Sequence, residues 1–345
     1  MNLRDFDYYL PDELIARYPP SLREDSRLLI MHRDMPHFED KKFPDIIEYM
    51  HSGDVLVLNE TKVIPARIFG KRETTGAGVE IFLLHKQTDR VDIWHILAAP
   101  AKKVKSGEKI YINQDLYCEV LEELPEGERI VRFFSKRNHI EELIEAAGTM
   151  PIPPYLKRNA EAIDKERYQT VFGRVQGAVA APTASLHFTE TLLSQIEAKG
   201  VSIAKVLLHV GLGTFRPVEA EKIEEHKMHS EYFELSANAA DTINRVRSTG
   251  GKIIAVGTTT ARTLESSSNE KGEIIPQSGE TSIFIYPPYK FKAVDALITN
   301  CHQPKSSLLM MVSAFAGYEN IMKAYQHAID KKYRFLSYGD AMMIV

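Results

Sequence analysis

The distribution of β-rich segments is the feature that most constrains the fold of this chain. From Val63 onward, short runs of β-branched and aromatic residues follow one another with no helix-like segment between them. These runs are Val79–Leu83, Asp92–Leu97, Lys109–Ile112, Tyr117–Val120 and Arg129–Phe134. Strands at this close spacing, separated by Gly, Asn or Asp turns, predict a small barrel or sandwich. A helix over His139–Ala147, capped by Asn138 and stopped by Gly148, is predicted to end the block.

The segments on either side of this block follow a different pattern. Before it, a helix is predicted over Pro11–Arg17, because proline at its first position and acidic residues in its first turn are typical of a helix start. The prolines of 151–154 form a stiff connector after the block, and helices and strands then alternate. Alternation predicts an α/β layer architecture with helices covering a sheet. We therefore expect an α/β main domain over 1–62 and 151–345, with a β-rich barrel domain inserted at 63–150.

The elements expected in the main domain can be stated by residue range. Predicted helices cover 190–199, Ala237–Ser248, Ser307–Ala316 and Tyr318–Lys331. Predicted strands cover Leu28–Met31, Val55–Asn59, Val201–Val210, Lys252–Val256, Thr281–Tyr286, Val294–Asn300 and Met342–Val345.

A run of small residues, Gly177–Ala181, precedes Pro182 and a polar stretch. Residues without bulk let another backbone or a flat ligand come close. If the following segment is extended, Thr183, Ser185, His187 and Thr189 lie on one face. A tightly packed strand is the alternative, but buried hydroxyls and imidazoles need partners that a plain apolar core lacks. We therefore expect a binding site here.

Two predicted strand ends carry polar side chains. Gly257, Thr258 and Thr259 follow the strand at 252–256, and Arg262 stands a turn later. Open α/β sheets bind ligands beyond the carboxyl ends of their strands, so this turn is a candidate carboxylate or phosphate site. A plain threonine helix cap is the alternative.

The second strand end leads into His302, Lys305 and Ser306. The lysine and serine at a helix start predict an anion site, although the glycines of a P-loop are missing. His302 is a candidate acid or base, with a structural histidine as the alternative. Asp340 stands in a nearly uncharged tail and is a candidate buried functional acid.

Two further sequence patterns do not support a dinucleotide site or a metal site. Gly211 and Gly213 form Gly-x-Gly after a strand, but Arg216 replaces the third glycine of a dinucleotide fingerprint. His226 and His229 could touch one metal ion if helical, yet no complete ligand set stands nearby. We predict no metal site and no cofactor.

Several short motifs occur in a fixed order along nearly the whole chain. They are the segments 26–29, 53–59 with 65–67, 168–171, 177–189, 209–215, 226–229, 257–259, 304–306 with 308–310, and 338–342. Together these motifs resemble those of the S-adenosylmethionine:tRNA ribosyltransferase-isomerase family of queuosine biosynthesis. The sequence departs from the family's pattern at Ser185, Pro288, Cys301 and Gln303, a difference that concerns local loop shape.

The resemblance implies an enzyme that uses S-adenosylmethionine as a ribosyl donor. It would transfer and isomerise the ribosyl unit onto 7-aminomethyl-7-deazaguanine at the tRNA wobble position, giving epoxyqueuosine-tRNA, adenine and methionine. S-adenosylmethionine is then a co-substrate and tRNA the partner. The candidate bases are His187, His302 and Asp340, with His187 ranked first, and Thr183, Ser185, Gly257, Thr258, Thr259, Arg262, Lys305 and Ser306 are candidate substrate contacts. The alternatives are an S-adenosylmethionine-dependent tRNA methyltransferase and a non-catalytic RNA-binding module.

The amino-acid composition limits what we expect of RNA contacts, disulfides and location. The formal net charge of −4 excludes a broad basic footprint, so we expect RNA to be held by a local patch, with Arg23 and Arg27 as candidate contacts. The two cysteines imply no disulfide framework. The N-terminal residues do not form a secretory signal, and no apolar run reaches membrane-spanning length. We expect a cytoplasmic monomer that does not bind membranes.

Overall fold

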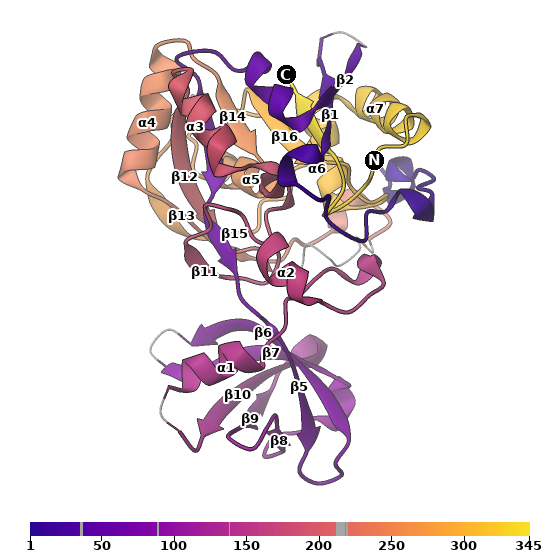
Figure 1. Ribbon diagram of the computed structural model, residues 1–345, viewed down its shortest axis with the longest axis vertical. Coiled ribbons are helices and arrows are strands. Elements are labelled where there is room, and N and C mark those ends of the chain that lie inside the picture. Colours follow the sequence, from indigo (N-terminus) through magenta and orange to yellow (C-terminus); the bar gives the residue numbers. More distant parts are fainter. Residues whose placement is uncertain (35–36, 88–89, 138, 212–217, 219) are drawn as a thin grey trace.

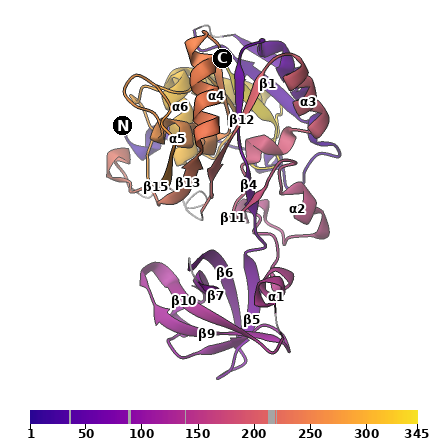
Figure 2. The same ribbon diagram turned by 90° about the vertical axis from the view of Figure 1, so that its left-hand side faces the viewer.

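The computed structural model describes residues 1–34, 37–87, 90–137, 139–211, 218 and 220–345. The chain folds into a larger α/β lobe and a smaller barrel lobe, which are joined by a narrow waist (Figures 1 and 2). Both chain termini lie in the larger lobe (Figure 1). Within the described residues, no helix combines the length and the apolar character needed to cross a membrane.

The larger lobe is built on a nine-stranded sheet in the order β15-β13-β12-β3-β14-β16-β17-β1-β2. Its central strands β12, β3, β14 and β16 are parallel, whereas β17 runs antiparallel to β16. The strands are β1 Arg27–Met31, β2 Phe38–Lys42, β3 Val55–Asn59, β12 Ser202–Leu208, β13 Glu231–Leu235, β14 Ile253–Val256, β15 Gln277–Thr281, β16 Ala296–Asn300 and β17 Ala341–Ile344. A short parallel pair, β4 Thr61–Val63 and β11 Val175–Ala178, lies beside this sheet.

Helices cover both faces of the sheet. The strands bury side chains on both faces, so β3 directs Val55 and Val57 into one apolar cluster and Leu56 and Leu58 into another. The first cluster includes residues of α4 Ala237–Ser248, α5 Thr258–Ser266, α6 Ser307–Ala316 and α7 Tyr318–Asp330. The second includes residues of α3 Glu190–Ala198 and of the 3-10 helix Phe43–Tyr49. The predicted α/β layer architecture is confirmed.

The smaller lobe is a closed six-stranded antiparallel barrel in the order β10-β7-β6-β5-β8-β9. Its strands are β5 Arg67–Arg72, β6 Gly78–Gln87, β7 Arg90–Ala99, β8 Lys109–Tyr111, β9 Leu116–Glu123 and β10 Glu128–Ser135, and α1 Ile140–Ala147 follows them. The predicted inserted barrel is confirmed, although β5 was missed because half of its residues are cationic and only Ile68 and Gly70 are buried.

The chain passes between the two lobes twice, and hydrogen bonds and close packing join the two connecting segments. Arg67 N–H donates to Thr149 O (3.2 Å) and Thr149 N–H to Arg67 O (2.8 Å). A Cβ atom at Gly148 would lie 1.8 Å from Pro65 O, so only glycine permits this close approach. Val63 and Met150 pack in a cluster of the larger lobe, whereas Ile64 and Ala66 pack in the barrel core. These contacts support the domain limits 62/63 and 150/151, which remain our proposal.

Two predicted elements are wrong. Pro11–Arg17 forms only a 3-10 turn at Asp12–Leu14, because no apolar stripe fixes a longer helix against the core. The strand expected at Thr281–Tyr286 ends at Thr281, its first residue, because β15 pairs with β13 only over Gln277–Thr281. The proposed cap Asn138 lies outside the described residues, and His139 directly precedes α1 in a left-handed conformation.

Candidate active site

A small cavity lies at the carboxyl ends of the parallel strands β14 and β16, where ligand sites of open α/β sheets occur. Its volume is about 70 Å³. We call it the strand-end cavity. It is lined by residues 180–184, 257–259, 299, 300, 302, 303, 336 and 337, with Tyr155, Tyr168, Val210, Ser306 and Leu308.

The turn after β14 brings three predicted residues to this cavity. Gly257 has φ +87°, a left-handed conformation that favours glycine, and α5 begins at the next residue. Thr258 and Thr259 also line the cavity, and Thr259 Oγ1 lies 3.3 Å from Asn59 Nδ2. Thr260 instead donates to Val256 O (2.7 Å) within the helix. The helix N-terminus and two hydroxyls therefore surround one side of the cavity.

Arg262 does not join this group. Its guanidinium is buried and forms an ion pair with Glu231, and it lines a separate small cavity. The sequence suggested a shared anion site because Arg262 follows Gly257 by little more than one helical turn. The α5 helix, however, directs Arg262 toward β13 and away from the strand-end cavity.

The segment after Pro182 is not extended, so the predicted face of alternating hydroxyls is wrong. Thr183–His187 forms a 3-10 helix, with Ser185 N–H donating to Pro182 O (2.9 Å). Thr183 lines the strand-end cavity and donates to Asn300 Oδ1 (3.2 Å). Ser185 is buried beneath the cavity wall, and its hydroxyl has no hydrogen-bond partner among the described residues.

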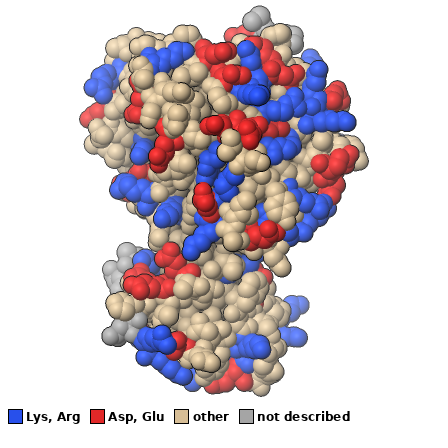
Figure 3. All heavy atoms as spheres, viewed as in Figure 1, with Lys and Arg blue, Asp and Glu red and all other residues tan. Residues whose placement is uncertain are grey.

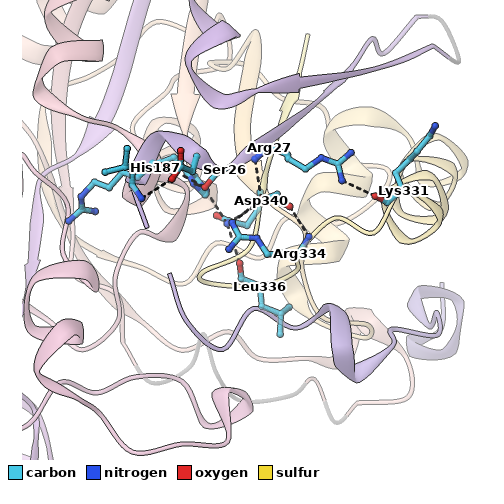
Figure 4. A network of polar contacts seen from close by, with 11 residues as sticks. Ser26, Arg27, His187, Lys331, Arg334, Leu336 and Asp340 are labelled. Atoms are coloured by element: carbon cyan, nitrogen blue, oxygen red, sulfur yellow. Dashed lines mark hydrogen bonds and ion pairs between the residues drawn. The ribbon is translucent and has the colours of Figure 1, made fainter. Parts of the chain in front are cut away.

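His187 is buried with both ring nitrogens in contact with polar groups (Figure 4). Nδ1 lies 2.9 Å from Ser26 Oγ, and Nε2 lies 3.2 Å from Asn300 Nδ2. Burial lowers the pKa of His187 to about 3, and the positive charges of Arg334 and Arg23 contribute. His187 does not line the strand-end cavity. It orients Asn300, which does line it.

His302 is the one predicted base that lines the strand-end cavity. Its Nε2 lies 2.8 Å from Thr299 Oγ1, and its backbone N–H donates to the Tyr325 hydroxyl oxygen (2.9 Å). Burial lowers the pKa of His302 to about 3, so the imidazole is neutral. A neutral imidazole on the cavity wall can accept a proton from a bound molecule.

Asp340 and Lys305 have partners within the chain. The Asp340 carboxylate is buried and accepts hydrogen bonds from the Arg27 N–H (3.1 Å), the Arg334 N–H (2.8 Å) and the Arg334 guanidinium (3.0 Å) (Figure 4). Lys305 Nζ forms an ion pair with Asp7 (2.7 Å). Neither residue lines the strand-end cavity.

Ser306 lines the strand-end cavity and caps α6. Its Oγ accepts a hydrogen bond from Leu309 N–H (3.2 Å) and donates to Gln303 O (2.7 Å). A serine cap explains this residue fully, so the structure adds no anion contact to it.

The two arginines proposed to contact RNA also bond within the chain. The Arg23 guanidinium donates to Leu186 O (2.9 Å) and Glu166 O (3.0 Å). Arg27 donates to Lys331 O (2.7 Å) and lies over the Tyr333 ring at 3.7 Å from its centroid. The Arg27 side chain is 37% exposed, so a phosphate contact at this residue stays a prediction.

A larger cavity, about 750 Å³, lies between the two lobes. We call it the interlobe cavity. Trp94 and His95 of β7 line it from the barrel, and His209 and Tyr232 line it from the larger lobe. It adjoins the strand-end cavity, because Val210 lines both. Sequence reasoning missed this cavity because its walls come from segments that are far apart in the chain.

Sequence reasoning also missed two side chains. His209 was considered only for the Gly-x-Gly pattern that follows it, of which Gly213 and Arg216 lie outside the described residues. Tyr168 is fully buried on the strand-end cavity, and its hydroxyl makes no hydrogen bond within the described structure. Its place in a polar motif, 168–170, was the available signal. Among the described residues, no three His, Cys, Asp or Glu side chains are grouped to hold a metal ion.

A layered α/β lobe with a cavity at its polar strand ends has the arrangement in which open α/β sheets bind ligands, and the interlobe cavity adds a second, larger space. The family model described as "Queuosine biosynthesis protein" matches residues 3–344. The chain therefore belongs to this queuosine biosynthesis family, as its motifs predicted.

Similar proteins cover the whole chain. Proteins named S-adenosylmethionine:tRNA ribosyltransferase-isomerase are 49% identical in Desulforamulus reducens and 50% identical in Pelotomaculum thermopropionicum, each over 100% of both chains. A crystal structure of S-adenosylmethionine tRNA ribosyltransferase from Thermotoga maritima is 38% identical, with a TM-score of 0.57 over 99% of this chain and 100% of that one.

Proposed function

We propose that this protein transfers and isomerises the ribosyl unit of S-adenosylmethionine onto 7-aminomethyl-7-deazaguanine at the wobble position of tRNA. The products are epoxyqueuosine-tRNA, adenine and methionine. The observation that carries this proposal is the identity of about half of all residues with relatives of that name over their full length. A tRNA substrate implies a cytoplasmic enzyme, and we expect it to act as a monomer.

The strand-end cavity suits the polar end of the donor. Its volume of about 70 Å³ accommodates part of S-adenosylmethionine only. The N-terminus of α5 and the hydroxyls of Thr258 and Thr259 offer donors to the methionine carboxylate. His302 lies on the same cavity and is our candidate for the base that removes the proton beside the sulfonium group.

The interlobe cavity suits the acceptor nucleoside. Its volume of about 750 Å³ falls within the range of roughly 300–1,000 Å³ usual for ligand sites. On the face shown in Figure 3, Lys and Arg side chains are interspersed with Asp and Glu over both lobes. We therefore expect the tRNA backbone to be held through few phosphate contacts, with modest affinity that falls steeply with salt.

Product analysis tests the proposal. Purified protein, S-adenosylmethionine and tRNA carrying the 7-aminomethyl-7-deazaguanine base should release adenine and methionine in equal amounts. Release of S-adenosylhomocysteine would identify a methyltransferase instead. Binding of tRNA without any turnover would identify an RNA-binding module.

A further inference from the structure

Gly177 explains why His209 can lie open to the interlobe cavity. Gly177 has φ +150°, and a Cβ atom there would lie 2.6 Å from His209 Nε2 and 2.7 Å from its Cε1. Both residues line the interlobe cavity. The flat group that approaches the small-residue run is thus an imidazole of the same chain, and the missing side chain leaves space in front of Nε2.

The other ring nitrogen of His209 is already bound. Nδ1 lies 2.8 Å from Thr61 Oγ1, and the ring stacks on Tyr232 with centroids 5.9 Å apart and planes at 26°. Within the described part of the chain, Nε2 has no hydrogen-bond partner. When Nδ1–H donates to the Thr61 hydroxyl, the Nε2 lone pair faces the cavity.

The surroundings of His209 keep its ring neutral. Burial lowers the pKa of His209 below its usual value. The titratable groups on the neighbouring β13 are Glu231, which forms an ion pair with Arg262, Tyr232 and the exposed Glu234; on β4 Lys62 is exposed, and β11 carries none. The other titratable groups that line the cavity are His229 and Glu280 of the larger lobe, and His85, Lys86, His95, Glu128, Glu141 and Glu145 of the barrel lobe.

We propose that His209 Nε2 is the proton acceptor for the amine of the acceptor base. This inference rests on the proposed function. The aminomethyl group is an ammonium at neutral pH, with an alkylamine pKa of roughly 10. One N–H bond of the ammonium breaks, its electron pair stays on nitrogen, and the proton binds Nε2 to give an imidazolium. The lone pair of the freed amine then forms the new C–N bond to the donor ribosyl carbon, while adenine and methionine leave with the electron pairs of the C–N and C–S bonds that joined them to the ribosyl unit. This step would take place beside Val210, which lines both cavities.

The test compares two reactions of the same enzyme. His209→Gln should lower single-turnover transfer to the tRNA base by about 10²- to 10⁴-fold, the usual effect of losing a positioned base. Hydrogen–deuterium exchange at the ribose carbon beside the sulfonium should persist, as should S-adenosylmethionine affinity. The difference in transfer rate between His209→Gln and wild type should become smaller as pH rises, because the ammonium then loses its proton to solvent without an enzyme base.

Two further variants separate chemistry from folding. Gly177→Ala keeps the imidazole but places a methyl group where it would lie 2.6 Å from Nε2, so the His209 ring must shift, and the variant should also lose transfer while exchange persists. His327→Gln replaces a partly exposed histidine that pairs with Asp40 on the opposite side of the larger lobe, and it should behave as wild type.

The outcomes are distinguishable. Transfer within tenfold of wild type in His209→Gln, or equal loss of exchange and transfer at every pH, overturns the role of His209. If His209→Gln does not fold, Gly177→Ala alone decides by the same two readouts. Absence of adenine and methionine release by the wild-type protein overturns the proposed function itself.

Discussion

The Tyr168 hydroxyl gives the sharpest test of the strand-end cavity, because stability and binding should change in opposite directions. Tyr168 is fully buried and lines the cavity, and its hydroxyl, which lies near the Ala181 backbone and the Ser337 hydroxyl, makes no hydrogen bond of good geometry among the described residues. Burial raises the pKa of this phenol far above its usual value, so the hydroxyl stays protonated and can donate. We infer that it donates to the bound donor.

The expected magnitudes follow from this geometry. A buried polar group without a partner costs roughly 1–3 kcal/mol, so Tyr168→Phe should raise the free energy of unfolding by about 1 kcal/mol after some packing is lost. Loss of one hydrogen bond to S-adenosylmethionine should cost about 0.5–1.5 kcal/mol, which weakens binding by about 2- to 10-fold. Urea unfolding and calorimetric titration with S-adenosylmethionine measure the two effects.

Tyr155→Phe is the matched control. Tyr155 lines the same cavity, but its hydroxyl is hydrogen-bonded to Ser337 Oγ. Its removal should lower the free energy of unfolding by about 1 kcal/mol. If Tyr168→Phe is destabilised as strongly as Tyr155→Phe and binds the donor normally, the Tyr168 hydroxyl is structural and our reasoning is refuted.

Three other outcomes are expected. Arg262→Met should lower the free energy of unfolding in urea by about 3–5 kcal/mol, because Glu231 is left buried and unpaired, and donor binding by the folded fraction should be unchanged. The free energy of unfolding should fall as pH drops from about 6.5 toward about 3, because His187 and His302 bind protons in the unfolded chain but stay neutral in the folded one. Replacing both histidines by Gln should flatten the dependence of the thermal-unfolding midpoint on pH over that window. An unchanged dependence would contradict the assignment. Arg27→Ala should reduce the salt slope of tRNA binding by about one contact, and an unchanged slope would show that this side chain serves only the fold.

The sequence pattern predicted those helices and strands whose apolar side chains all enter one core. The helix at Ala237–Ser248 and the strand at Val55–Asn59 were predicted to the residue, because a stripe or a run of apolar side chains enters one continuous core. The extended conformation expected after Pro182 was wrong because two backbone hydrogen bonds, from Ser185 N–H to Pro182 O and from Phe188 N–H to Ser185 O, hold a 3-10 helix that no periodic pattern reveals.

The candidate site was predictable only in part. Gly257 and Thr258 meet His302 at one cavity because the parallel strands β14 and β16 end at the same edge, which the sequence pattern predicts. Thr183 reaches the same cavity from a 3-10 helix, which the sequence did not predict. Arg262 was misplaced because its partner Glu231 stands far back in the chain. The interlobe cavity depends on how the barrel is set against the sheet, which no local pattern specifies.

The proposed reaction needs a proton removed from each of two substrates, and histidines line both cavities: His302 the strand-end cavity, and His85, His95, His209 and His229 the interlobe cavity. His302 lines the strand-end cavity, and His209 lines the interlobe cavity. Val210 lines both cavities, so the donor carbon and the acceptor amine would be joined beside it. His187, although the first candidate from sequence, reaches neither cavity, and its contact with Asn300 suits it to positioning. Hydrogen–deuterium exchange at the ribose carbon of the donor should therefore depend on His302 alone. Ribosyl transfer should depend on both His302 and His209. A mechanism with a single base would make both reactions depend on the same residue.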